Sequence, residues 1–208
     1  MIKSSIKNLI FDLGGVIINL DTSATVKALG KLGKITDDET VSIYTLEFFR
    51  NYEKGLISDE EFRQQLQLKL SNCSAADINL AWNSMLQDIP PGRLEFLKWL
   101  RNNYRMFLLS NTNQIHIDQV NIILKNVCGA ADFSHFFDKT YYSHQLKMRK
   151  PDTEIFKHVL EENILAAEET LFIDDSAENL TGAEKLGIHT LLVTSENSLF
   201  DFFNYGRS

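Results

Sequence analysis

The chain has few cysteines, no long basic run and no long apolar run, and each shortage narrows the class of protein. Its two cysteines, Cys73 and Cys128, stand far apart in no metal-ligand spacing, so neither is expected to be a ligand or a nucleophile. Unpaired thiols are typical of the reducing cytoplasm. The formal net charge is −7, which argues against nucleic acid or an anionic membrane as a partner, because both need a basic face. A cytoplasmic protein is therefore expected.

The first twenty residues do not read as a membrane segment. Asp12 interrupts their apolar stretch, which is too short to span a bilayer, and no small-residue cleavage site follows it. Apolar residues make up 44% of the chain and charged residues 24%, as in soluble globular proteins. A chain of 208 residues can form one core domain that carries a modest insertion.

Four short apolar runs predict buried strands, at residues 8–13, 106–111, 170–175 and 189–194. Each run is continuous rather than alternating, as in strands that are covered on both faces of a parallel sheet. Stretches with helical spacing of apolar residues lie between the runs. This alternation predicts an α/β domain with a doubly wound parallel sheet.

Residues 21–88 break the alternation, because they show no strand pattern and their apolar residues recur at helical intervals. Residues 40–70 are expected to hold two helices separated near residues 55–58, with Ser58 capping the second helix through Glu61. A further helix is expected over 74–86. The segment is interpreted as a helical insertion into an α/β core made of residues 1–20 and 89–208.

Three of the four runs end in residues that can react, namely Asp12, the pair Ser110 and Asn111, and the pair Asp174 and Asp175. The carboxyl ends of strands in a doubly wound sheet share one edge, where ligands bind. Three segments that are far apart in the sequence are therefore expected to meet in one crevice.

Lys150 lies before Pro151 and a predicted helix, where a cation and a helix N-terminus together suit an anion. Each candidate residue also has an ordinary interpretation, because such carboxylates and Ser–Asn pairs form turns and caps and most lysines are solvated. Together they predict a phosphoryl-transfer site. A carboxylate such as Asp12 can accept a phosphoryl group, and Mg²⁺ suits gathered carboxylates and bridges to phosphate. Ser110 and the amide that follows it can hold phosphoryl oxygens, and Lys150 offsets their charge.

Four motifs, "FDLGGV", "SNT", "KP" and "IDD", appear in the order found in a known superfamily. The chain resembles the haloacid dehalogenase-like hydrolases over essentially its whole length, and most closely the branch that contains α-D-glucose-1-phosphate phosphatase. The resemblance implies a Rossmann-like core with a helical cap of the C1 type inserted after the first motif, in agreement with residues 21–88. The stretch between Asn111 and Lys150 is too short for the second cap type found elsewhere in the superfamily.

The resemblance also implies a role for each candidate residue. Asp12 is the implied nucleophile, and Lys150 neutralises a phosphate that Ser110 and Asn111 hold. The expected reaction is hydrolysis of a small phosphorylated metabolite, by preference a sugar phosphate, through an aspartyl-phosphate.

The implied Mg²⁺ ligands are Asp12, the backbone carbonyl of Gly14, Asp175, and Asp174 in direct or water-mediated contact. Adjacent residues of a strand point opposite ways, so both acids of the last motif can face the ion only if the strand is already turning.

Gly14 departs from the superfamily pattern, in which most phosphatases carry an aspartate two residues after the nucleophile. That aspartate is a general acid and base, a group worth about 10²–10⁴ in rate. Three explanations stay open. The leaving group needs little proton help, as in a sugar 1-phosphate; a cap residue such as Glu53 or an ordered water substitutes; or the protein binds a phosphorylated ligand without turnover. The first two are favoured, because the similar branch shows a like glycine and hydrolyses phosphate esters.

Two alternative functions compete with phosphatase activity. A phosphate-binding regulatory domain without turnover has Gly14 as its sole support. A 2-haloacid dehalogenase also uses an aspartate nucleophile, but it needs no metal, so the pair Asp174 and Asp175 counts against it. His116 follows Asn111 closely enough to reach the rim of the pocket, although a surface position is expected for it.

Overall fold

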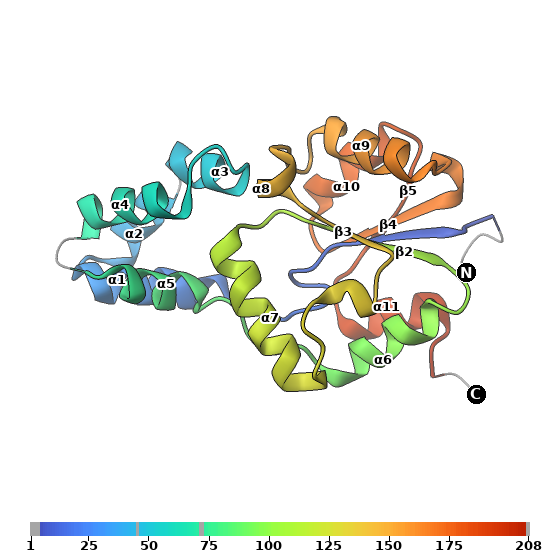
Figure 1. The fold of residues 1–208 in the computed structure, drawn as a ribbon, viewed down its shortest axis with the longest axis horizontal. Helices are drawn as coiled ribbons and strands as arrows, with labels where there is room; N and C mark the ends of the chain where they lie inside the picture. The colour runs from blue at the N-terminus through green and yellow to red at the C-terminus, as the bar shows by residue number, and fades with distance from the viewer. Residues whose placement is uncertain (1–4, 45, 71–72, 207–208) are drawn as a thin grey trace.

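The structure is a computed structural model that describes residues 5–44, 46–70 and 73–206, and it is built around one parallel sheet (Figure 1). Within the described residues the sheet has five strands in the order β3–β2–β1–β4–β5. Their bounds are β1 Asn8–Phe11, β2 Arg105–Ser110, β3 Lys139–Tyr142, β4 Thr170–Asp174 and β5 His189–Leu192. All neighbouring strands pair in parallel. Strand β1 therefore lies at the centre of the sheet, between β2 and β4.

Helices cover both faces of this sheet, as Figure 1 shows. One face packs against α6 (Pro91–Leu100), α7 (Gln114–Cys128) and α11 (Glu196–Phe203), and Leu9 and Phe11 of β1 point into that core. The opposite face packs against α9 (Thr153–Asn163) and α10 (Ala177–Glu184), where Ile10 of β1 points. A strand covered on both sides is apolar along nearly its whole length, and in β1 the buried Asn8 at its start is the exception. The predicted doubly wound α/β fold is confirmed.

Strand β3 was not predicted from the sequence. Four strands were predicted, and β3 is the additional strand of the sheet. It lies at the edge of the sheet. Lys139 is exposed and Thr140 half-buried, whereas Tyr141 and Tyr142 are buried. An edge strand need not be apolar throughout, so its residues form no continuous apolar run. Near it lie η1 (Phe133–His135) and the short α8 (Ser143–Leu146), while η2 (Ala167–Glu169) precedes β4.

Helices α1 to α5 follow β1 and lie to one side of the sheet, at the left of Figure 1. We call them the helical segment; they are α1 (Thr22–Gly33), α2 (Asp37–Tyr44), α3 (Glu47–Glu53), α4 (Asp59–Leu70) and α5 (Ala75–Asn83). They share a hydrophobic core in which Phe62 contacts Phe49, Tyr52 and Trp82. Ile115 at the start of α7 joins this core. No helix in the described stretches is long and apolar enough to cross a bilayer.

Residues 40–70 hold parts of three helices rather than the predicted two. Helix α2 ends at Tyr44 and α3 begins at Glu47, after an extended Leu46; position 45 lies outside the described residues. Apolar residues keep a helical spacing across this break, so periodicity gives no sign of it. The second break is confirmed, because Ser58 N–H donates to Glu61 Oε2 over 2.7 Å and Glu61 N–H donates to Ser58 Oγ over 3.2 Å.

Candidate active site

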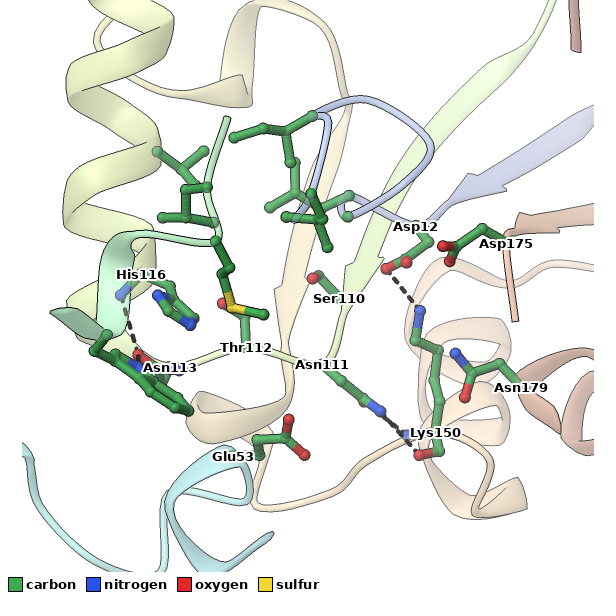
Figure 2. A pocket seen from close by; sticks show the side chains of 18 residues that line it. Asp12, Glu53, Ser110, Asn111, Thr112, Asn113, His116, Lys150, Asp175 and Asn179 are labelled. Atoms are coloured by element: carbon green, nitrogen blue, oxygen red, sulfur yellow. Dashed lines mark hydrogen bonds and ion pairs between the residues drawn. The ribbon is translucent and has the colours of Figure 1, made fainter. Parts of the chain in front are cut away.

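The carboxyl ends of three adjacent strands hold most of the predicted site residues. Asp12 follows β1, Ser110 ends β2 and Asp174 ends β4. Because β1 lies between β2 and β4, these three segments meet at one edge of the sheet. There they border a cavity of about 200 Å³ lined by Asp12, Gly14, Ser110, Asn111, Lys150 and Asp175, among others. Figure 2 shows this cavity with Asp12 and Asp175 on one side.

Lys150 is fully buried and joins two of the predicted carboxylates. Its Nζ lies 2.8 Å from Asp12 Oδ1 and 2.6 Å from Asp174 Oδ2. Asn179 donates to both oxygens of Asp174 over 3.1 Å, and the N–H of Ser176 donates to Asp174 Oδ1 over 2.8 Å. Buried charges are tolerated when they are paired and hydrogen-bonded in this way. The ordinary interpretation of Lys150 as a solvated lysine is wrong.

The shifted pKa values of the carboxylates around Lys150 show that this part of the cavity has too little positive charge. Burial raises the pKa of Asp12 to about 7; the charge of Asp174 adds to the rise, and Lys150 acts against it. Burial alone would lower the pKa of Lys150, but the charges of Asp12 and Asp174 outweigh it and raise that pKa. Burial and the charge of Asp174 also raise the pKa of Asp175. One lysine does not balance three carboxylates, so their ionised form calls for a further cation.

The carboxylates have the geometry of a site for a hard cation. Asp12, Asp174 and Asp175 each offer an oxygen, and these oxygens lie within 4.8 Å of one another. Mg²⁺ prefers carboxylate oxygens as ligands, so three carboxylates gathered this closely are a suitable set of donors for that ion. Strand β4 ends at Asp174, and the chain turns there so that Asp175 also faces the cluster. The condition that both acids face one ion is met.

Gly15 is a site residue absent from the sequence prediction. Its φ of +69° favours glycine, and a Cβ on it would lie 2.1 Å from Asp175 Oδ2. Only a glycine lets Asp175 come this close to the loop after β1. The adjacent glycines at 14 and 15 were the available signal. A Cβ on Gly14 would instead meet Leu20 Cδ1 at 2.6 Å, so Leu20 takes the space where a longer side chain at position 14 would begin.

The side chain of Asn111 holds the backbone of Lys150. Its Nδ2 donates to the Lys150 carbonyl and its Oδ1 accepts from the Lys150 N–H, both over 2.9 Å. This two-way bond ties the loop after β2 to the segment before α9, and thereby sets the position from which Lys150 reaches the carboxylates. Ser110 is buried beside it and lines the cavity.

The far side of the cavity contains His116, for which the expected surface position is wrong. His116 is 8% exposed, and its ring stacks on Trp82 of α5 with centroids 4.8 Å apart and an interplanar angle of 6°. Asn113 caps α7 by accepting from the His116 N–H over 3.0 Å, and it also accepts from Trp82 Nε1 over 3.3 Å. Burial lowers the pKa of His116 to about 3. Periodicity could not reveal this burial, because it results from contact with α5, a helix some thirty residues earlier in the chain.

The helical segment closes another side of the cavity through Glu53. Glu53 lines the cavity, as expected for a candidate acid, but its Oε2 accepts from Arg149 over 3.1 Å. Its carbonyl accepts from Ser143 Oγ over 2.6 Å. Lys54 pairs with Asp152 over 3.1 Å. Polar contacts therefore dock the end of α3 on the core, next to the cavity.

The sequence model of the protein family of haloacid dehalogenase-like hydrolases matches residues 9–193. The chain belongs to this family. The match spans the strands that carry the site, so the family resemblance of the four motifs is confirmed.

Relatives within the haloacid dehalogenase-like family resemble nearly the whole chain. A D-ribitol-5-phosphate phosphatase of Bacteroides thetaiotaomicron is 32% identical over 89% of this chain and 90% of its own. A haloacid dehalogenase family enzyme of the same organism, crystallised as an aspartate-to-alanine mutant with magnesium and inorganic phosphate, has a TM-score of 0.87 at 37% identity, covering 95% of this chain and 98% of its own. The structure of a related hydrolase of Porphyromonas gingivalis has a TM-score of 0.86 at 32% identity, and the likeness covers 99% of this chain and 100% of its own.

Proposed function

We propose that the protein is a Mg²⁺-dependent phosphoric monoester hydrolase that acts on a small sugar or polyol phosphate. The observation that carries the proposal is the cluster of Asp12, Asp174 and Asp175 beside the buried Lys150. The family match supports a hydrolase, and the relative named as a D-ribitol-5-phosphate phosphatase supports a phosphorylated substrate. The similar enzyme crystallised with magnesium and phosphate supports the cofactor. The special likeness to the glucose-1-phosphate branch stays a prediction.

The proposed mechanism assigns a task to each residue. Asp12, Asp174, Asp175 and the carbonyl of Gly14 would hold Mg²⁺, which when bound neutralises charge and orients the phosphate. An oxygen of Asp12 attacks phosphorus as the bond to the leaving oxygen breaks, which forms an aspartyl-phosphate.

Other groups of the chain stabilise that reaction. Lys150 offsets negative charge. The hydroxyl of Ser110 and the backbone N–H of Asn111 donate hydrogen bonds to phosphoryl oxygens. Because Gly14 supplies no acid, the leaving oxygen takes its proton from water. A second water then attacks phosphorus of the acyl-phosphate and gives its proton to the hydroxide left by the first, and the bond from phosphorus to the Asp12 oxygen breaks, which releases inorganic phosphate and restores Asp12.

Residues 21–88 are proposed to be a cap over a core of residues 1–20 and 89–208. The hydrophobic core of the helical segment takes only Ile115 from outside residues 21–88 among its described buried members, which supports a separate unit. Trp82, Met85 and Leu86 line the cavity, so residues 21–88 contribute one wall of the site. A cap of this kind excludes water from the reacting groups.

Phosphate release from sugar and polyol phosphates, with and without Mg²⁺, tests the proposed function. Release should require Mg²⁺ and should fall by roughly 10⁴-fold or more in Asp12→Asn, which retains the fold but lacks the nucleophile. The exposed Asp118→Asn is the matched control. Metal-independent turnover, or an active Asp12→Asn, would contradict the proposal, and chloride release from 2-chloropropionate would then test the dehalogenase. If the folded protein binds Mg²⁺ and hydrolyses none of the esters, the phosphate-binding alternative is favoured.

A further inference from the structure

The cavity extends well beyond the residues that handle phosphate. Figure 2 places Asp12 and His116 on opposite sides of it. The wall of the cavity also includes a group of apolar side chains: Leu13, Ile18, Leu20, Met85, Leu86 and Val120. A phosphate held at Asp12 therefore directs its leaving group across an apolar surface toward His116.

The hydrogen bonds of His116 define which proton it carries. Its Nδ1 lies 2.8 Å from Asn83 Oδ1. An amide oxygen can only accept, so Nδ1 is the donor of this bond. Burial keeps the ring neutral at physiological pH, because it lowers the pKa of His116 to about 3. In a neutral ring with the proton on Nδ1, the other nitrogen, Nε2, has a free lone pair and is an acceptor.

The ring of His116 is also held in one orientation. Trp82 stacks on its face, Asn83 bonds one edge, and the Asn113 cap fixes the backbone at the start of α7. His116 lines the cavity, and its Nε2 has no hydrogen-bond partner within the described part of the chain. An acceptor that borders the cavity and has no such partner is available to a hydrogen-bond donor on a ligand.

We infer that His116 is a specificity-determining residue, whose Nε2 accepts a hydrogen bond from a hydroxyl at the end of the leaving group remote from the phosphate. The carbon chain between the two ends lies on the apolar wall. The inference rests on the proposed phosphatase function and narrows its substrate class to short phosphate monoesters with a distal hydroxyl. Distal placement matters because Asp12 and His116 lie on opposite sides of the cavity (Figure 2).

A matched pair of esters tests this inference: 5-hydroxypentyl phosphate and pentyl phosphate differ only in the distal hydroxyl. For the wild-type protein with Mg²⁺ we expect kcat/KM to be about tenfold or more higher for the hydroxylated ester, as one buried hydrogen bond provides. His116→Phe, which keeps an aromatic ring on Trp82 but removes the acceptor, should bring the ratio close to one, mainly through KM. His116→Gln, whose amide oxygen can accept, should restore part of the ratio. The exposed His135→Gln is the control and should not change it.

The outcomes separate the two proposals. An unchanged ratio in His116→Phe overturns the inference, and so does an equal loss on both esters, which would show a merely structural role. Calorimetric titration of both esters into Asp12→Asn, with and without His116→Phe, measures the same ratio without turnover. If the wild-type protein hydrolyses neither these two esters nor the sugar and polyol phosphates, the phosphatase proposal fails, while this binding ratio still decides on His116. Should His116→Phe not fold, the comparison of His116→Gln with wild type decides.

Discussion

At the scale of single residues, the site depends on one lysine that serves two carboxylates. Lys150 Nζ lies within hydrogen-bond distance of both Asp12 and Asp174, and all three side chains are nearly excluded from water. Lysine is seldom fully buried unless it is paired. Its removal would leave two like charges facing each other in a poorly solvated place.

Lys150→Met should therefore destabilise the protein strongly when no metal is present. We expect the free energy of unfolding at pH 7 to fall by about 3–5 kcal/mol, the usual cost of breaking a buried ion pair. Added Mg²⁺ should restore part of it by replacing the lost charge. Urea unfolding in chelator and in Mg²⁺ measures both effects. Lys7→Met removes the exposed pair with Glu169 and is the control; an equal loss in both variants would contradict this account.

His116 should make the protein less stable in acid. Its pKa is lowered by burial to about 3, whereas an unfolded histidine titrates near 6.5. Below pH 6.5 the unfolded chain binds a proton that the folded protein does not, so stability is full above pH 6.5 and falls as the pH drops toward 3. The cost at pH 5 is about 2 kcal/mol.

Unfolding of wild type and His116→Gln in urea at pH 7 and pH 5 checks this prediction. The drop in the free energy of unfolding between these pH values should be smaller in the variant by about 2 kcal/mol. Other titrating groups are common to both proteins and cancel in the comparison. The same drop in both would mean that His116 accepts a proton in the folded state.

At the scale of elements, helix α10 must lie close to the loop that carries Lys150. A Cβ on Gly182 would come within 2.1 Å of the Pro151 carbonyl oxygen and 2.9 Å of Phe156 Cε2. The same helix carries Asn179, which donates to Asp174. The position of α10 is thereby linked to two groups of the site.

Gly182→Ala should displace α10 or the Lys150 loop, although alanine is the better helix former. We expect a loss of about 1–3 kcal/mol in stability, as for overpacked cores, together with lower phosphatase activity. Gly92→Ala in α6 is the matched control, because a Cβ there would lie 3.8 Å from its nearest neighbour, Glu196 Oε1. Thermal unfolding and phosphate release check both. Equal stability and equal activity of the two variants would show that α10 can shift enough to accommodate the added methyl group.

At the scale of the whole molecule, the helical segment meets the core beside the cavity. A Cβ on Gly55 would lie 1.9 Å from the His144 carbonyl oxygen, and the φ of Gly55 is +62°. The neighbouring pair of Lys54 and Asp152 is partly exposed. The close backbone contact at Gly55 should hold the helical segment against the core more strongly than the ion pair does, because exposed ion pairs contribute at most about 1 kcal/mol to stability.

Gly55→Ala should therefore move the helical segment off the core, whereas Lys54→Ala should change little. For Gly55→Ala we expect kcat/KM to fall by roughly 10–10²-fold, since about 1 Å of misplacement has effects of this size. Helix content should stay the same, because the separate core around Phe62 is untouched. Steady-state kinetics and circular dichroism measure the two properties. A larger loss in Lys54→Ala would contradict this ranking.

The α/β alternation, the helical segment and the order of the reactive residues along the chain could all be predicted from the amino-acid sequence. These features are local: a strand buried on both faces is nearly continuously apolar, and a surface helix repeats its apolar residues every three to four positions. The carboxyl ends of parallel strands share one edge. Asp12, Ser110 and Asp174 could therefore be placed together from sequence reasoning alone.

The details that depend on contacts between distant segments became visible in the three-dimensional structure. It placed β3 at the edge of the sheet, buried His116 against Trp82, brought Asp175 onto Gly15, and engaged the Asn111 side chain with Lys150. In each case a residue's role depends on a neighbour that comes from another element. Periodicity and spacing report which face of its own element a residue occupies. They carry no information about which side chain lies opposite, and that is why the far end of the cavity emerged only from the fold.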